Sequence, residues 1–192
     1  MHAHAEPAPR GSTLQQFDTL VAHCKSIFLQ KLSRYGPSWR HFRPASLADQ
    51  MLIKARRIRT LEEQGFTAVG EGVETEYQAL VNYAIITLLQ MRFGPAPEVG
   101  IDPLTPNQIS TFYDEEAEKI RSLLIAKNQD YGDAWRQMLL SSLTDMIIVK
   151  IVRVRQLLIN PSSDSTQEVV SNLQDICNYA IFALIRLEEI KE

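Results

Sequence analysis

Apolar residues recur along this chain at spacings of three and four, a pattern typical of helices that bury one face. Near the start of the chain they are Leu14, Phe17, Val21, Cys24 and Phe28. A second stripe of the same kind consists of Ile109, Tyr113, Ala117, Ile120 and Leu124. The pattern therefore predicts an amphipathic helix at each of these two places.

Both stretches open with sequences that favour a helix start. Ser12 is followed three residues later by Gln15, as in a capping box. Thr105 is followed by Pro106 in the first helical position and by Gln108 in the third. We therefore expect helices to begin near residues 12 and 105.

Each of these helices is followed by two more helical segments. The next helix is expected to begin at Ser46 or Ser142, with Asp49 or Asp145 as the acidic member of a capping box. Residues 146–158 are apolar on almost every side, as in a central helix. The third helix of each half comes after a short break, and no segment has the alternation of a strand.

The two halves of the chain are copies of one unit. Between Asp18 and Leu88, 21 of 71 positions are identical to the residue 96 positions later, whereas unrelated sequences match at roughly one position in fifteen. The match has no gap. An internal repeat of this length implies that the two halves of the chain have the same local fold.

The repeat predicts an all-α fold of two three-helix units, packed as one pseudo-twofold six-helix bundle. We expect a disordered tail at 1–11, a first repeat at 12–93, a proline-rich linker at 94–105 and a second repeat at 106–192. Each unit has one broad apolar face, so neither is expected to fold alone. The chain would then form one compact domain, like a fused homodimer, and further dimerisation is left open.

Composition narrows the classes of function. The net charge is −3 and no basic face stands out, which disfavours an extended nucleic-acid footprint. No window approaches about 18 apolar residues, so no membrane span is expected. Residues 1–11 do not read as a signal peptide, which suggests a cytoplasmic protein. Cys24 and Cys177 are not repeat equivalents and are interpreted as buried apolar residues.

Polar residues on the second and third helices of the later half form a candidate site. At 100° per residue, Asp145, Lys150 and Arg153 share one broad face of their helix. Asp175 lies one turn before Asn178, and it could meet Lys150 or Arg153. Buried cations need a carboxylate partner or a bound anion.

The equivalent residues of the earlier half are Asp49, Lys54, Arg57 and Asn82, but Ala79 stands where the later half has Asp175. The two asparagines fall within apolar stripes and are expected inside the bundle, where they need hydrogen-bond partners. Three acids open the third helix of the earlier half, namely Glu71, Glu74 and Glu76. We interpret them as solvated residues that complement the helix dipole, in preference to metal ligands.

The helix ends also carry candidate ligand contacts. Lys31 and Lys127 end apolar stripes, where each could complement the helix dipole or face a phosphate. Gly36 and Gly132, which come shortly after these lysines, are each expected to cap their helix at positive φ. Tyr131 and Trp135 could plug the end of the bundle or stack on a nucleobase. Both alternatives stay open.

The matched residues resemble the nucleotide modification associated domain 1 family, in two tandem copies. The pattern is K-x-x-D-Y-G-x-x-W, then S-L-x-D-x-x-x-x-K-x-x-R, then D-x-x-N-Y-A, and the later copy fits it better. The earlier copy departs from it at Arg34 and Ala79. The family is similar at a distance to MazG-like all-α nucleoside triphosphate pyrophosphatases, although their full set of acidic residues is not evident here.

This resemblance implies a nucleotide-handling protein and three hypotheses. In the first, a Mg²⁺-dependent pyrophosphohydrolase, Asp145 and Asp175 are catalytic and hold the metal. The phosphate and nucleotide contacts would be Lys127, Lys150, Arg153, Asn178, Tyr131 and Trp135, with first-copy equivalents Lys31, Asp49, Lys54, Arg57 and Asn82. The second hypothesis is a non-catalytic nucleotide-binding module, and the third is a structural helical interaction module whose polar residues satisfy one another.

Overall fold

A computed structural model describes residues 12–65, 72–97 and 102–191, and these form six α-helices and two short 3-10 helices without a strand among them. The first copy contributes α1 (Thr13–Tyr35), η1 (Ser38–His41), α2 (Pro44–Gln64) and α3 (Gly72–Phe93). The second contributes α4 (Pro106–Tyr131), η3 (Ala134–Gln137), α5 (Leu140–Ile159) and α6 (Ser165–Lys191). The expected all-α, duplicated bundle is confirmed.

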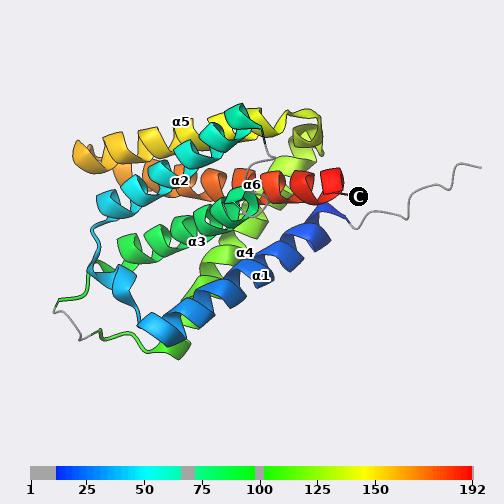
Figure 1. Ribbon diagram of the computed structural model, residues 1–192. Helices are drawn as coiled ribbons and strands as arrows, with labels where there is room; N and C mark the ends of the chain where they lie inside the picture. Colours follow the sequence, from blue (N-terminus) through cyan, green and yellow to red (C-terminus); the bar gives the residue numbers. More distant parts are fainter. Residues whose placement is uncertain (1–11, 66–71, 98–101, 192) are drawn as a thin grey trace, which may run out of the picture.

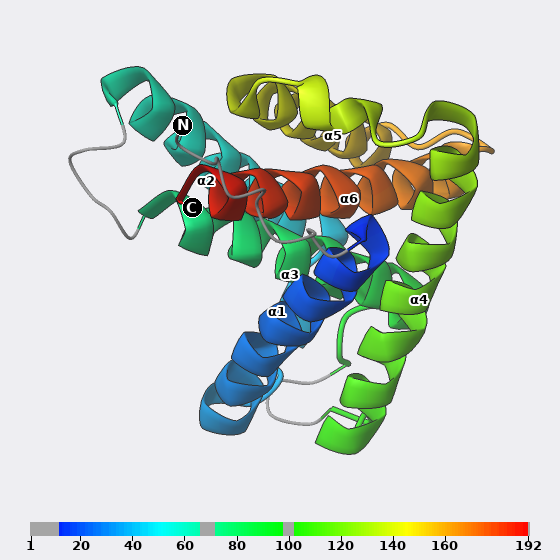
Figure 2. The ribbon, with the colours of Figure 1, turned by 90° about the vertical axis from the view of Figure 1, so that its right-hand side faces the viewer.

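The helices lie in three layers, each with one helix from each copy (Figure 1). Helices α2 and α5 form one outer layer, α3 and α6 the middle layer, and α1 and α4 the other outer layer. A view turned by 90° shows the same order, with α1 and α4 splayed apart (Figure 2). The middle helices therefore carry most of the core, and α6 is buried almost continuously from Cys177 to Ile185.

Four ion pairs join equivalent helices of the two copies in a reciprocal pattern. Between α1 and α4, the pairs are Lys25 with Asp114 at 2.6 Å and Arg121 with Asp18 at 2.8 Å. Between α2 and α5, they are Arg59 with Asp145 at 2.6 Å and Arg155 with Asp49 at 2.5 Å. Each pair maps onto its partner by a shift of 96 residues, which is the relation of an isologous dimer interface.

The expected helix starts are confirmed for α1 and α4. Ser12 accepts a hydrogen bond from the backbone of Gln15, whose side chain accepts one from the backbone of Ser12. Thr105 and Gln108 form the same reciprocal box. Both helices thus satisfy their first free backbone N–H groups locally.

The expected starts of α2 and α5 are wrong by two residues. Helix α2 begins at Pro44 and α5 at Leu140, and neither residue before them makes a side-chain cap. Proline at the first helical position already has the helical φ, and its missing N–H is one that a helix start leaves free. Asp49 and Asp145 are therefore not capping residues, and they make the ion pairs between copies instead.

Glycine is required where α1 and α4 end. Gly36 has φ +67° and ψ −173°, and Gly132 has φ +57° and ψ −148°. The positive φ matches the expectation, whereas ψ lies outside the left-handed helical region, in a region essentially limited to glycine. This backbone turns the chain into η1 and η3, which carry the two tryptophans.

The described part of the linker is held against the first copy by Arg40 of η1. This buried guanidinium donates to Asp102 at 2.9 Å and to Gln90 at 2.7 Å. It also donates to the carbonyl of Gly94 at 2.5 Å. Both ends of the linker are thus held by one side chain.

Within the described residues, none of the helices is both long and apolar enough to cross a membrane. The expected tail at 1–11, Glu71 and the middle of the linker at 98–101 lie outside the described residues.

Candidate functional site

Each copy carries a pocket at the same place. The first pocket has a volume of about 390 Å³ and lies among α1, η1, α2 and α3. The second pocket has a volume of about 320 Å³ and lies among α4, η3 and α6. Each of the 12 residues that line the second pocket has its counterpart, 96 positions earlier, in the lining of the first. The duplication therefore produced two copies of one pocket.

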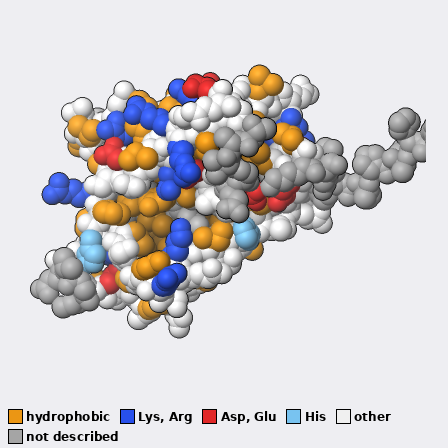
Figure 3. Space-filling model, viewed as in Figure 1, with side chains coloured by type: hydrophobic (Ala, Val, Ile, Leu, Met, Phe, Trp, Pro, Cys, Tyr) orange, Lys and Arg blue, Asp and Glu red, His pale blue; other side chains and the backbone are white. Residues whose placement is uncertain are grey.

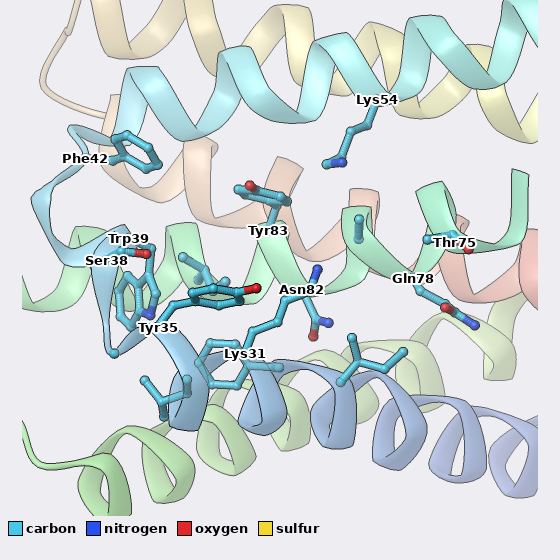
Figure 4. A pocket seen from close by; sticks show the side chains of 16 residues that line it. Lys31, Tyr35, Ser38, Trp39, Phe42, Lys54, Thr75, Gln78, Asn82 and Tyr83 are labelled. Atoms are coloured by element: carbon cyan, nitrogen blue, oxygen red, sulfur yellow. The ribbon is translucent and has the colours of Figure 1, made fainter. Parts of the chain in front are cut away.

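The first pocket is an apolar hollow with cations at its edge. Figure 3 shows hydrophobic side chains in the hollow between α2 and α1, with Lys and Arg side chains around it. In Figure 4, Lys31 extends from α1 and Lys54 from α2 toward the space between the two helices, while Asn82 and Tyr83 project from α3. A ligand in this space would meet an apolar wall and positive charge together.

The two lysines of the first pocket differ in their partners. Lys31 is exposed and has no hydrogen bond or ion pair with any described residue. Lys54 lies 3.2 Å from Glu76 and 5.8 Å from the centre of the Tyr83 ring. At least one full positive charge therefore faces the pocket without compensation from a residue that the structure describes.

Glu76 corrects one sequence expectation. We expected it to be a solvated residue, but it is buried and binds both Lys54 and Arg57, the latter at 2.5 Å. A buried carboxylate needs such partners, because its desolvation would otherwise be costly. The partners come from α2, one turn apart, and they tie α2 to α3.

In the second pocket a carboxylate joins the lysines. Asp175 is buried, contacts Lys127 of α4 through one oxygen, and lies 2.9 Å from Lys150 of α5 through the other. The expected contact between Asp175 and Lys150 is thus present. Asp175 neutralises charge here that stays uncompensated in the first pocket.

The tryptophans occupy equivalent places at the pocket ends. Trp39 and Trp135 are each 7% exposed, and neither indole N–H has a hydrogen-bond acceptor in the described structure. Trp135 also stacks on Phe182 of α6, with ring centres 4.2 Å apart. In contrast, Tyr35 and Tyr131 are exposed at the pocket margins. A buried N–H without an acceptor costs about 1–3 kcal/mol.

Both asparagines are buried, as expected, but only one is satisfied. Asn82 donates to the carbonyl of Cys24 at 2.9 Å and accepts from the Tyr113 hydroxyl at 2.7 Å. Neither amide atom of Asn178 has a partner in the described residues. The repeat explains the missing donor, because the position equivalent to Tyr113 is Phe17, which has no hydroxyl.

The structure does not bring together all the residues of the candidate site. Asp145 is exposed and lies with Arg59 and Glu62 in a separate open pocket. Asp175 lines the second pocket instead. In the part of the chain that the structure describes, no three His, Cys, Asp or Glu side chains cluster in a way that could hold a metal ion. The two carboxylates expected to share a metal thus lie in different pockets.

Arg153 also lies outside the second pocket. It donates to Glu168 at 2.6 Å on the protein surface. This hydrogen bond lowers the pKa of the Glu168 carboxyl and outweighs the opposing effect of desolvation. In the first copy, Arg57 binds Glu76 and Asp49 binds Arg155, so the equivalents of Arg153 and Asp145 also have protein partners.

Some of the polar residues were not assigned to the candidate site from the sequence. Tyr83 and Tyr179 line the two pockets and are identical in both copies, so the repeat could have marked them. Glu62 forms a network with Tyr77 at 3.2 Å and with Thr144 at 2.7 Å. The repeat equivalents of these three residues are Leu158, Leu173 and Ala48, so the duplication gave no signal for the network.

Comparison with known proteins gives one match. The family model described as nucleotide modification associated domain 1 matches the chain twice, at residues 31–91 and 127–187. Each match begins at a pocket lysine and covers most of the pocket lining. Searches of curated proteins and of solved structures gave no match.

Proposed function

The chain belongs to the nucleotide modification associated domain 1 family, and on this premise we propose that it binds a nucleotide in the first pocket. The observation that carries the proposal is the exposed Lys31, which has no partner among the described residues and faces an aromatic-lined hollow across from Lys54. The volume, about 390 Å³, is within the range of small-molecule pockets.

The phosphate end of the ligand lies between α1 and α2. Lys31 and Lys54 converge there from the two helices (Figure 4). Lysine binds phosphate as a point charge, so two lysines accept different phosphate orientations. The energy of this contact comes mainly from Lys31, because Glu76 already compensates Lys54.

The base end of the ligand lies toward η1. Trp39, Tyr35 and Phe42 line this end of the pocket (Figure 4). Stacking of a base on an aromatic ring contributes about 1–3 kcal/mol by alanine substitution.

Binding is a better-supported function than hydrolysis. The Mg²⁺ site expected from the sequence needs Asp145 and Asp175 in one place, and they lie in different pockets. The residues therefore do not fit that metal site, and we derive no hydrolytic step. The pocket lysines and aromatic rings need no metal to hold a nucleotide.

The proposal is tested by thermal unfolding and titration calorimetry with ribo- and deoxyribonucleoside mono-, di- and triphosphates in the presence of EDTA. We expect at least one nucleotide to raise the melting temperature, because ligand that binds only the folded state stabilises it. Lys31→Met should weaken binding tenfold or more. The matched variant Lys127→Met should change it less than twofold, since Lys127 is paired with Asp175.

The same panel also tests the alternatives. If no nucleotide changes the melting temperature or produces heat, the proposal is wrong and the structural hypothesis is favoured. Mg²⁺-dependent release of pyrophosphate that is lost in Asp175→Ala would favour the hydrolase hypothesis and would place the reaction in the second pocket.

A further inference from the structure

The two pockets differ at one position that determines their charge. Ala79 of α3 lines the first pocket, and its counterpart in the second is Asp175 of α6. The lysines around this position are the same in both copies: Lys31 matches Lys127, and Lys54 matches Lys150. One set of cations therefore surrounds a carboxylate in one pocket and a methyl group in the other.

We propose that the Asp175 carboxylate occupies in the second pocket the place that a ligand anion takes in the first. The first pocket then binds a phosphate group beside Ala79, between Lys31 and Lys54, and the second pocket is closed to phosphate by its own side chain. This inference rests on the proposed function only for the identity of the whole ligand as a nucleotide. The position of the anion is argued independently of it.

The contacts of Asp175 show how an anion would be held. One carboxylate oxygen contacts Lys127, and the other lies 2.9 Å from Lys150, so the group bridges helices α4 and α5. A phosphate also presents two oxygens to two ammonium groups. Helices α1 and α2 are the first-copy equivalents of α4 and α5, and they carry Lys31 and Lys54. An anion bound in the first pocket would therefore bridge α1 and α2.

Glu76 does not take over the role of Asp175 in the first copy. It lies one turn earlier on α3 than Ala79, and its oxygens bind Lys54 and Arg57. Lys31 is left without a hydrogen bond or an ion pair among the described residues. Its counterpart Lys127 is held by Asp175. A bound anion would give Lys31 the partner that its counterpart already has.

Charge pairing gives the same answer. In the first copy, a single described carboxylate, Glu76, pairs with two cations, Lys54 and Arg57. Lys31 is a third cation and has no partner among the described residues. In the second copy, Asp175 binds both equivalent lysines, and Glu168 binds Arg153. The first pocket thus keeps a positive charge that a phosphate can neutralise, whereas Lys127, Lys150 and Arg153 of the second copy are all paired.

The test is a reciprocal exchange read by ¹H–¹⁵N correlation spectra during titration with inorganic phosphate. In the wild type, we expect shifts confined to amides of α1, α2 and α3 around Lys31, Lys54 and Ala79. Ala79→Asp should supply an internal carboxylate and weaken phosphate binding tenfold or more. Asp175→Ala should open a second site, with new shifts around Lys127 and Asp175 and two phosphates bound per chain.

Ala79 lines the pocket and is partly exposed, so an aspartate has room there. Should Ala79→Asp fail to fold, Lys31→Met is the second variant, and it should also lose the wild-type shifts. The inference is wrong if the wild type does not bind phosphate, if phosphate shifts the second pocket in the wild type, or if neither Ala79→Asp nor Lys31→Met weakens binding.

The result is separable from that of the nucleotide panel. Phosphate binding at Lys31 without nucleotide binding would refute the proposed function and keep the inference. Nucleotide binding that needs Lys31 and Trp39 but is unchanged in a folded Ala79→Asp variant would support the proposed function and refute the inference.

Discussion

The guanidinium of Arg59 lies 2.6 Å from a carboxylate oxygen of Asp145, which joins α2 of the first copy to α5 of the second. The repeat reproduces this contact between Arg155 and Asp49 at 2.5 Å. The aspartate of the shared S-L-x-D motif is therefore used, in both copies, to connect the copies. This use explains an aspartate at this position without assigning it to a ligand site.

We expect Asp145→Ala to leave nucleotide binding unchanged and to reduce stability slightly. Both partners are substantially exposed, and exposed ion pairs typically contribute about 0–1 kcal/mol. Urea unfolding of Asp145→Ala, Arg59→Ala and the double variant would measure the pairwise term. Loss of nucleotide binding in Asp145→Ala would show that the carboxylate acts on the ligand.

Tyr113→Phe should destabilise the protein by about 1–3 kcal/mol, because it removes the donor to a buried amide oxygen. The Tyr113 hydroxyl donates to Asn82 at 2.7 Å in the core. The reciprocal variant, Phe17→Tyr, places a hydroxyl at the position related by the repeat, and it should stabilise by giving Asn178 a donor. Equal stabilities of wild type and Tyr113→Phe in urea unfolding would contradict the role of this bond.

Glu62 should make the stability of the protein decrease as pH rises. Desolvation raises the pKa of the Glu62 carboxyl above its ordinary value of 4.5, against the lowering effect of hydrogen bonds from Thr144 and Tyr77. The folded state then holds this proton more tightly than the unfolded state. This contribution is fully present below pH 4.5 and is lost as pH rises through the folded-state pKa.

The Glu62 effect can be measured by urea unfolding between pH 4 and pH 7. Glu62→Gln removes the titration, so its stability relative to wild type should rise across this range. Glu63→Gln, at an exposed neighbouring residue, is the matched control and should follow the wild-type profile. A constant difference between Glu62→Gln and wild type would show that Glu62 does not titrate differently in the two states.

Both cysteines should resist thiol reagents until the protein unfolds. Burial raises the pKa of the Cys24 thiol to about 12, and burial also raises that of Cys177. The thiolate is the reactive form, so little of it exists at pH 8. Modification by Ellman's reagent should be slow in buffer and complete in denaturant, and fast reaction in buffer would mean that the core opens readily.

The sequence was sufficient to predict the architecture because the signals are local and repeated. Capping boxes at Ser12 and Thr105 depend on residues three positions apart, and they are confirmed. The duplication predicted a paired arrangement of helices without any knowledge of their contacts. The starts of α2 and α5 were missed because Ser46 and Ser142 resemble capping residues, while the chain becomes helical two residues earlier.

The candidate site was predicted less completely, because its contacts depend on which helices become neighbours. Helical angles placed Asp145 and Lys150 on one broad face, but α5 contacts α2 on one side and α6 on another. Asp145 therefore meets Arg59, and Lys150 meets Asp175. Sequence spacing describes one helix at a time, so it cannot show which residues of α5 face α2 and which face α6.

The covalent link between the copies has an evolutionary consequence for Ala79 and Asp175. In a homodimer one gene encodes both pockets, so a substitution that opens one pocket to anions opens the other as well. Because this chain carries both units, one can lose a carboxylate while the other keeps it. Duplication thus permits a division of labour within one molecule that strict symmetry would forbid.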